Sequence, residues 1–71
     1  MNNKRDRFER VAVARTNKII KTLRLLSNCA DRNNYDYNEK DINKIFNAIE
    51  NELKKTKAKF NKNEESTKFT L

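Results

Sequence analysis

Apolar residues recur at helical spacing in two segments of this chain, and this repetition is the strongest constraint on its fold. The first apolar stripe consists of Phe8, Ala12, Ile19, Leu23, Leu26 and Ala30. The second apolar stripe consists of Ile42, Ile45, Phe46, Ile49, Leu53, Thr56 and Phe60. Because an α-helix has 3.6 residues per turn, each set falls on one helical face. The chain has no Gly and no Pro, so neither helix contains a strong breaker.

The second helix has a clear start signal in the sequence. Asn38 is a favoured N-cap residue, and Asp41 is the acid at the third helical position. Tyr37 stands before the cap, at the spacing that lets it pack on Ile42 as a hydrophobic staple. These four residues predict that the helix begins close to Glu39.

A polar connection over about residues 31–37 separates the two stripes. Asn33 and Asn34 are expected to supply the left-handed backbone conformation that glycine otherwise provides. If the chain folds back at this point, apolar residues face apolar residues along nearly the whole length, as for Leu23 and Phe46. This register favours an antiparallel arrangement of the two helices.

We therefore predict an all-α fold, an antiparallel two-helix hairpin with helices over about residues 5–29 and 39–60. Residues 1–60 form the hairpin domain, and residues 61–71 form a mobile polar tail, because the apolar pattern stops at Phe60. A core between only two helices is too small to be stable alone, so we expect a homodimer that forms a four-helix bundle. The apolar residues left over for that oligomer interface are Val13, Ile20 and Leu25.

The composition argues against enzymatic activity. The chain has no His and a single cysteine, Cys29, so a catalytic triad, a zinc site and an intramolecular disulfide are all excluded. Without Gly there is no glycine-rich loop to cradle a phosphate. No apolar run is long enough to be a signal peptide or a membrane span. We predict a cytoplasmic protein that is not an enzyme, uses no cofactor or metal and does not bind membranes.

Positive charge is concentrated at the two ends of the chain, which has a net charge of +7. Residues 1–28 carry eight cations against two acids, and residues 54–71 carry six lysines against two acids. Residues 29–53 carry three cations against six acids. A hairpin would bring the two basic ends together at its open tip. This distribution predicts an anionic partner, most simply nucleic acid.

The candidate contact residues are cations and amides on the polar side of each helix. Arginine and asparagine make the bidentate contacts that read bases, whereas lysine grips phosphates. The predicted nucleic-acid-binding residues are Arg7, Arg10, Asn17, Lys18, Lys21, Arg24, Lys54, Lys55, Lys57 and Lys59. DNA and RNA are both open as the partner. The alternative is a protein-binding inhibitor or adaptor that uses its basic face to occupy a nucleic-acid channel on another protein. An acidic protein surface is the corresponding alternative partner.

Two segments of the chain resemble a known group of proteins. They are Arg7-Phe8-Glu9-Arg10-Val11-Ala12, with the following run to Cys29, and Asn34-Tyr35-Asp36-Tyr37, with Lys44-Ile45-Phe46-Asn47-Ala48-Ile49-Glu50. Together these segments resemble small, largely uncharacterised proteins of plasmids and conjugative elements in low-GC Gram-positive bacteria. The resemblance covers about residues 7–60. It implies a mobile-element setting but carries over no activity and no functional residue.

Overall fold

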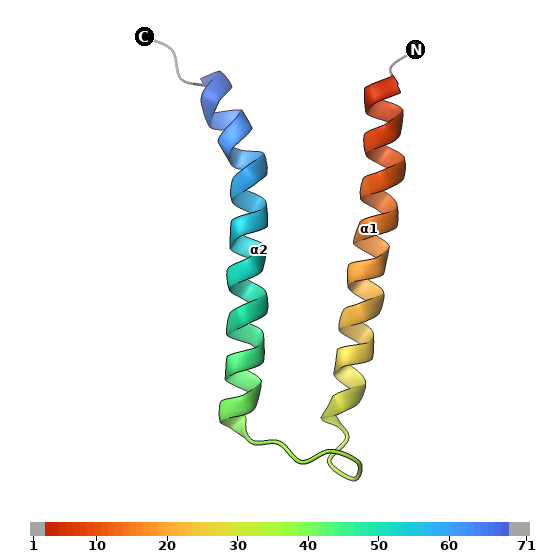
Figure 1. Ribbon diagram of the computed structural model, residues 1–71, viewed down its shortest axis with the longest axis vertical. Coiled ribbons are helices and arrows are strands. Elements are labelled where there is room, and N and C mark those ends of the chain that lie inside the picture. Colours follow the sequence, from red (N-terminus) through yellow and green to blue (C-terminus); the bar gives the residue numbers. More distant parts are fainter. Residues whose placement is uncertain (1–2, 69–71) are drawn as a thin grey trace. The chain divides into compact units, whose positions relative to one another are not determined.

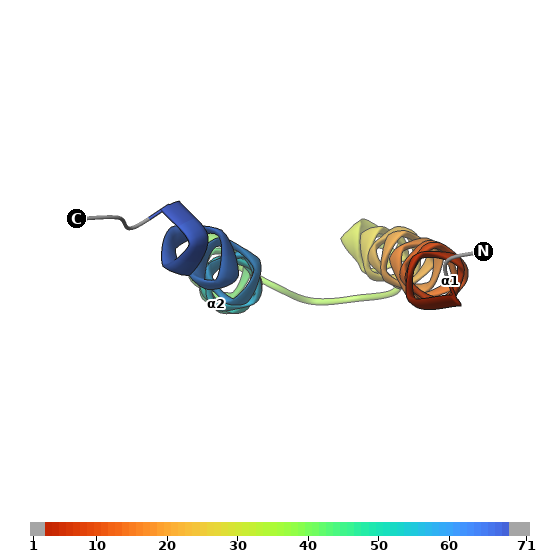
Figure 2. The ribbon, with the colours of Figure 1, turned by 90° about the horizontal axis from the view of Figure 1, so that it is seen from above.

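The computed structural model describes the backbone of residues 3–68 and the side chains of residues 3–61. Helix α1 spans Asn3–Ser27, a short 3-10 helix η1 spans Asn28–Ala30, and α2 spans Glu39–Lys68 (Figure 1). The described part of the chain contains no strand. The coils of α1 continue without a break in the view from above (Figure 2). The prediction of an all-α protein with two long helices is confirmed.

The end of α1 is followed by a turn that the side chain of Asp31 closes. One carboxylate oxygen accepts a 3.0 Å hydrogen bond from the backbone N–H of Asn33, and the other accepts a 2.8 Å bond from Nδ2 of Asn34. The backbone carbonyl of Asp31 accepts from the N–H groups of Asn34 and Tyr35 at 3.2 and 3.0 Å. No described residue has a positive φ, so the predicted left-handed conformation of Asn33 and Asn34 is wrong. Instead, the Asp31 carboxylate accepts hydrogen bonds from the residues that follow it and so stabilises the turn, as in an Asx turn.

Helix α2 begins with the predicted cap. Oδ1 of Asn38 accepts a 2.9 Å hydrogen bond from the backbone N–H of Asp41, and Oδ2 of Asp41 accepts a 3.0 Å bond from the backbone N–H of Asn38. This reciprocal pair is a capping box, and it satisfies two backbone donors that the first turn would leave unpaired. Tyr37 and Ile42, the predicted staple residues, are both half-buried.

Helix α2 does not end near Phe60, as the sequence pattern predicted, but continues to Lys68. The loss of the apolar repeat therefore did not mark the end of the helix. Residues 61–68 contain no Gly or Pro, and each added residue contributes a backbone hydrogen bond at little cost once a helix exists. The boundary predicted between the hairpin domain and the tail consequently falls inside α2. Residues 69–71 of the predicted tail lie outside the described part of the chain.

The chain divides into two units, Met1–Asp36 and Tyr37–Leu71. No side chain within residues 3–61 is buried. In the first unit, large residues of the first apolar stripe are open to solvent, with Phe8 50% and Ile19 61% exposed. In the second, Leu53 is 56% and Phe60 62% exposed. Each unit therefore presents an apolar face that can gain stability by being covered. Neither helix, over the described residues, is apolar over enough length to cross a membrane.

Candidate nucleic-acid interface

A row of basic and amide side chains runs along α1 on the side opposite its apolar stripe. The α1 basic row consists of Arg10, Asn17, Lys21 and Arg24. Successive members are three, four or seven residues apart, so the helical period aligns them, and they extend over about 21 Å at 1.5 Å per residue. All four side chains are exposed. The helix thus separates an apolar face from a hydrogen-bonding cationic face.

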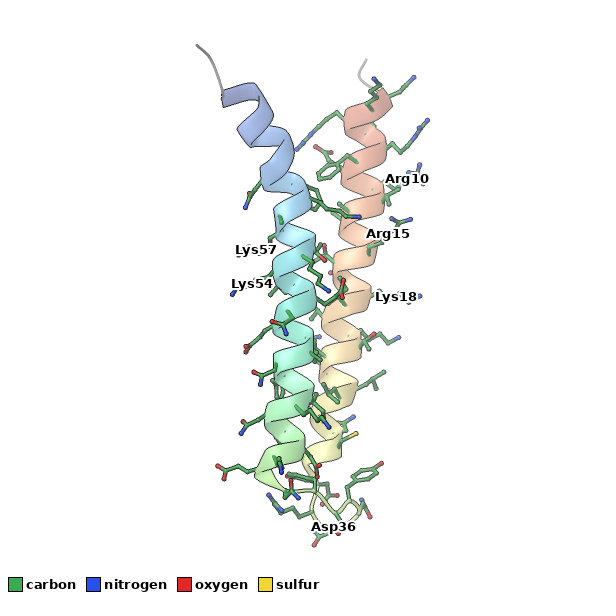
Figure 3. The ribbon with its side chains drawn as sticks, turned by 60° about the vertical axis from the view of Figure 1, so that its left-hand side comes forward. Arg10, Arg15, Lys18, Asp36, Lys54 and Lys57 are labelled. Atoms are coloured by element: carbon green, nitrogen blue, oxygen red, sulfur yellow. The ribbon has the colours of Figure 1, made fainter. Side chains whose placement is uncertain are left out.

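Arg7 and Lys18, the other two predicted contact residues of α1, lie beside this row. They are eleven residues apart, about three helical turns, and so share one flank of the helix. In Figure 3 the side chains of Arg10 and Lys18 extend to the same side of α1, and Arg15 lies between them. Arg15 belongs by its spacing to the edge of the apolar stripe, where its long side chain can reach past the stripe into solvent. One side of α1 consequently carries most of its cations.

Acidic side chains in α1 are confined to its N-terminal part. Arg5 donates from Nε to Oε1 of Glu9 at 2.8 Å, and its guanidinium lies 5.8 Å from the ring centre of Phe8. Arg5 is therefore engaged within its own helix. No acid occurs between Arg10 and Ala30. Arg10 has Asp6 four residues before it, but Lys21 and Arg24 have no carboxylate within i,i+4 reach on their own helix.

The four predicted lysines of α2 do not lie together. Lys54 and Lys55 lie on the side opposite the second apolar stripe, whereas Lys57 and Lys59 fall on the two flanks of that stripe. Figure 3 shows Lys54 and Lys57 extending from α2 with their amines in solvent. Lys54 and Lys57 are one turn apart, as are Lys55 and Lys59, so the four predicted lysines form two pairs on different sides of α2 instead of one cluster.

The side of α2 opposite its stripe carries basic and amide residues. The net charge summed over residues 29–53 is negative and does not reveal them. The α2 polar face consists of Lys40, Lys44, Asn47, Asn51, Lys54 and Lys55. The four acids of this stretch, Glu39, Asp41, Glu50 and Glu52, fall instead on the flanks of the stripe. Counting charge over residues 29–53 gave an acidic segment and so missed Lys40 and Lys44. A helical projection, which sorts charge by face, would have found them.

The three residues predicted for the oligomer interface are likewise divided. Val13 and Ile20 are seven residues apart and share one flank of α1, with 59% and 41% of their surfaces exposed. Leu25 lies on the other flank, five residues and more than a third of a turn around from Ile20. A single apolar strip beside the first stripe therefore contains Val13 and Ile20 but not Leu25.

These surfaces offer hydrogen-bond donors and positive charge. Guanidinium groups can donate paired hydrogen bonds to phosphate or to guanine, ammonium groups provide point charges, and carboxamides match adenine. Cys29 is exposed and no histidine exists to activate it. The described residues hold no group of three His, Cys, Asp or Glu side chains placed to bind a metal.

No family model, curated protein or solved structure matches this chain. The resemblance to proteins of plasmids and conjugative elements stays a prediction.

Proposed function

We propose that this protein binds nucleic acid through α1 and serves as a regulator or accessory factor of a mobile genetic element in the cytoplasm. The α1 basic row supplies the principal contacts, and Arg7 and Lys18 add contacts from the flank. Lys54, Lys55, Lys57 and Lys59 strengthen the attraction to phosphates. The partner is DNA or RNA.

The observation that carries this proposal is the acid-free row on α1. Exposed helices usually balance their cations with carboxylates one turn away, because such pairs stabilise the helix. Lys21 and Arg24 lack such neighbours, and Arg10 has one, Asp6. A solvated surface gains nothing from this imbalance, whereas a phosphate backbone neutralises it and releases condensed counterions.

We further propose that the two apolar stripes cover each other in an antiparallel hairpin, and that two copies assemble into a four-helix bundle. The support is the exposure of both stripes and the apolar register along them. Val13 and Ile20 lie beside the first stripe and are the natural contacts of a second copy. This assembly leaves the α1 basic row on the outside.

The test is binding of short DNA and RNA duplexes by a charge-reversed variant, R10E/K21E/R24E. If each side chain contacts one phosphate, the variant loses about 0.9 from the log–log salt slope for each lost DNA contact, and binding becomes undetectable at moderate salt. A variant that exchanges cation types, R10K/K21R/R24K, keeps the charge and serves as the matched control. It should retain affinity for duplexes of arbitrary sequence.

Unchanged affinity and salt slope in the charge-reversed variant would refute this proposal. If the wild-type protein instead binds free duplexes weakly but forms a tight one-to-one complex with a host protein, the alternative role of inhibitor or adaptor is correct. Circular dichroism of each variant establishes that the helices are intact, because Glu, Lys and Arg are all good helix formers.

A further inference from the structure

The α2 polar face carries lysines whose positions are not explained by helix stability alone. Lys40 stands in the first turn of α2, where the helix dipole disfavours a cation, and Lys44 follows one turn later. Lys57 and Lys59 lie nine or more residues before the end of α2 at Lys68, so the dipole, which acts within the last turn, does not favour them. Helix stability therefore does not explain the position of Lys40.

The amines of this face form no ion pair among the described residues, although Lys44, Lys54 and Lys55 each have an acid one turn before them. No ion pair joins Lys40, Lys44, Lys54 or Lys55 to an acid within residues 3–61. Asn47 and Asn51, one turn apart, lie between the two lysine pairs and are exposed. From Lys40 to Lys54 the face extends over about 21 Å, the same length as the α1 basic row.

The two helices thus have the same design, an apolar stripe on one side and an acid-free row of cations and amides on the other. If the stripes cover each other, as proposed above, the two polar rows must point away from each other. One straight duplex cannot lie against both rows at once. Each row is nevertheless complementary to a phosphate backbone.

We infer that the α2 polar face is a second nucleic-acid-binding face, so that one protein holds two separate duplex segments and bridges them. This inference rests on the proposed function and adds a second contact surface to it. Lys40, Lys44, Lys54 and Lys55 contact phosphates, and Asn47 and Asn51 lie between them at the level of the groove. Lys57 and Lys59 lie outside this contact.

A bridging assay tests the inference. One duplex is immobilised on beads, the protein is added, and retention of a second, labelled duplex is measured. The variant K40Q/K44Q should bind a single duplex within about twofold of wild type, since α1 is unchanged, but should need roughly tenfold more protein to retain the second. The variant K57Q/K59Q removes the same charge from the flanks; it should weaken binding of the first duplex but retain the second duplex in the same proportion to bound protein as wild type does. Lys-to-Gln changes preserve helix propensity, and circular dichroism confirms the helices.

The outcomes separate the inference from the proposed function. Wild-type protein that binds the immobilised duplex but retains no second duplex refutes bridging and leaves binding through α1 intact. Bridging by K40Q/K44Q at wild-type concentrations also refutes a contact by the α2 polar face. So does an equal loss of second-duplex retention, measured per bound protein, in K40Q/K44Q and K57Q/K59Q. Failure of wild-type protein to bind the first duplex overturns the proposed function itself.

Discussion

Asn38 and Asp41 fix the start of α2 by exchanging two hydrogen bonds at 2.9 and 3.0 Å. This pair was predictable because N-capping depends only on residues within one turn. The conformation of the turn after α1 was not predictable from the sequence. It contains Asp31, Asn33 and Asn34, and each of these residue types can close a turn in several ways. The sequence suggested left-handed asparagines, whereas the carboxylate of Asp31 accepts their N–H groups and makes a positive φ unnecessary.

Removing the cap should destabilise the second unit. Replacing Asn38 by Ala leaves the N–H of Asp41 without its acceptor and should lower the free energy of unfolding by about 1 kcal/mol. Urea denaturation followed by circular dichroism at fixed protein concentration measures this. Asn43→Ala, at an exposed site inside α2, is the control and should be neutral or slightly stabilising. Equal stability of the two variants would mean that the capping box is not formed in solution.

At the scale of the element, the existence and type of both helices followed from the apolar repeat, and the end of α2 did not. The repeat reports which side of a helix can be covered, and a helix can continue beyond that point when no breaker stops it. The net charge of a segment likewise does not show how charge is distributed between the faces of a helix. Lys40 and Lys44 belong to a basic face within a stretch of net negative charge.

The second apolar stripe should be needed for folding. Ile49 lies at its centre and is half-buried, so Ile49→Asp places a carboxylate where an apolar partner must pack. We expect the free energy of unfolding to fall by about 2–5 kcal/mol, with loss of the helical circular dichroism signal. Asn47→Asp makes the same charge change on the opposite side of α2 and should cost no more than about 0.5 kcal/mol. Similar stabilities for both variants would show that the stripe is not covered.

At the scale of the whole molecule, the pairing of the stripes and the homodimer stay predictions, and each has a direct test. Helical spacing assigns residues to faces, but the partner of a face depends on contacts between segments that no local pattern encodes. The predicted interface illustrates this difference. Val13 and Ile20 share a flank, whereas the equally apolar Leu25 lies on the other side of α1.

The homodimer is expected to depend on the strip formed by Val13 and Ile20. The double substitution V13E/I20E places two like charges in that interface and should convert the dimer to a monomer in sedimentation velocity at micromolar concentration. The variant A14E/T22E adds the same charge at exposed positions of α1 that lie at least a quarter of a turn around the helix from that strip, and it should remain dimeric. A wild-type protein that sediments as a monomer would exclude the four-helix bundle.

The central claim is that the protein binds nucleic acid through phosphate contacts made by exposed cations. The most direct measurement is the affinity of the wild-type protein for a short DNA duplex across a series of salt concentrations. If about six cations meet phosphates, the plot of log affinity against log salt has a slope near −5. A slope close to zero, or no binding even at low salt, would contradict the claim.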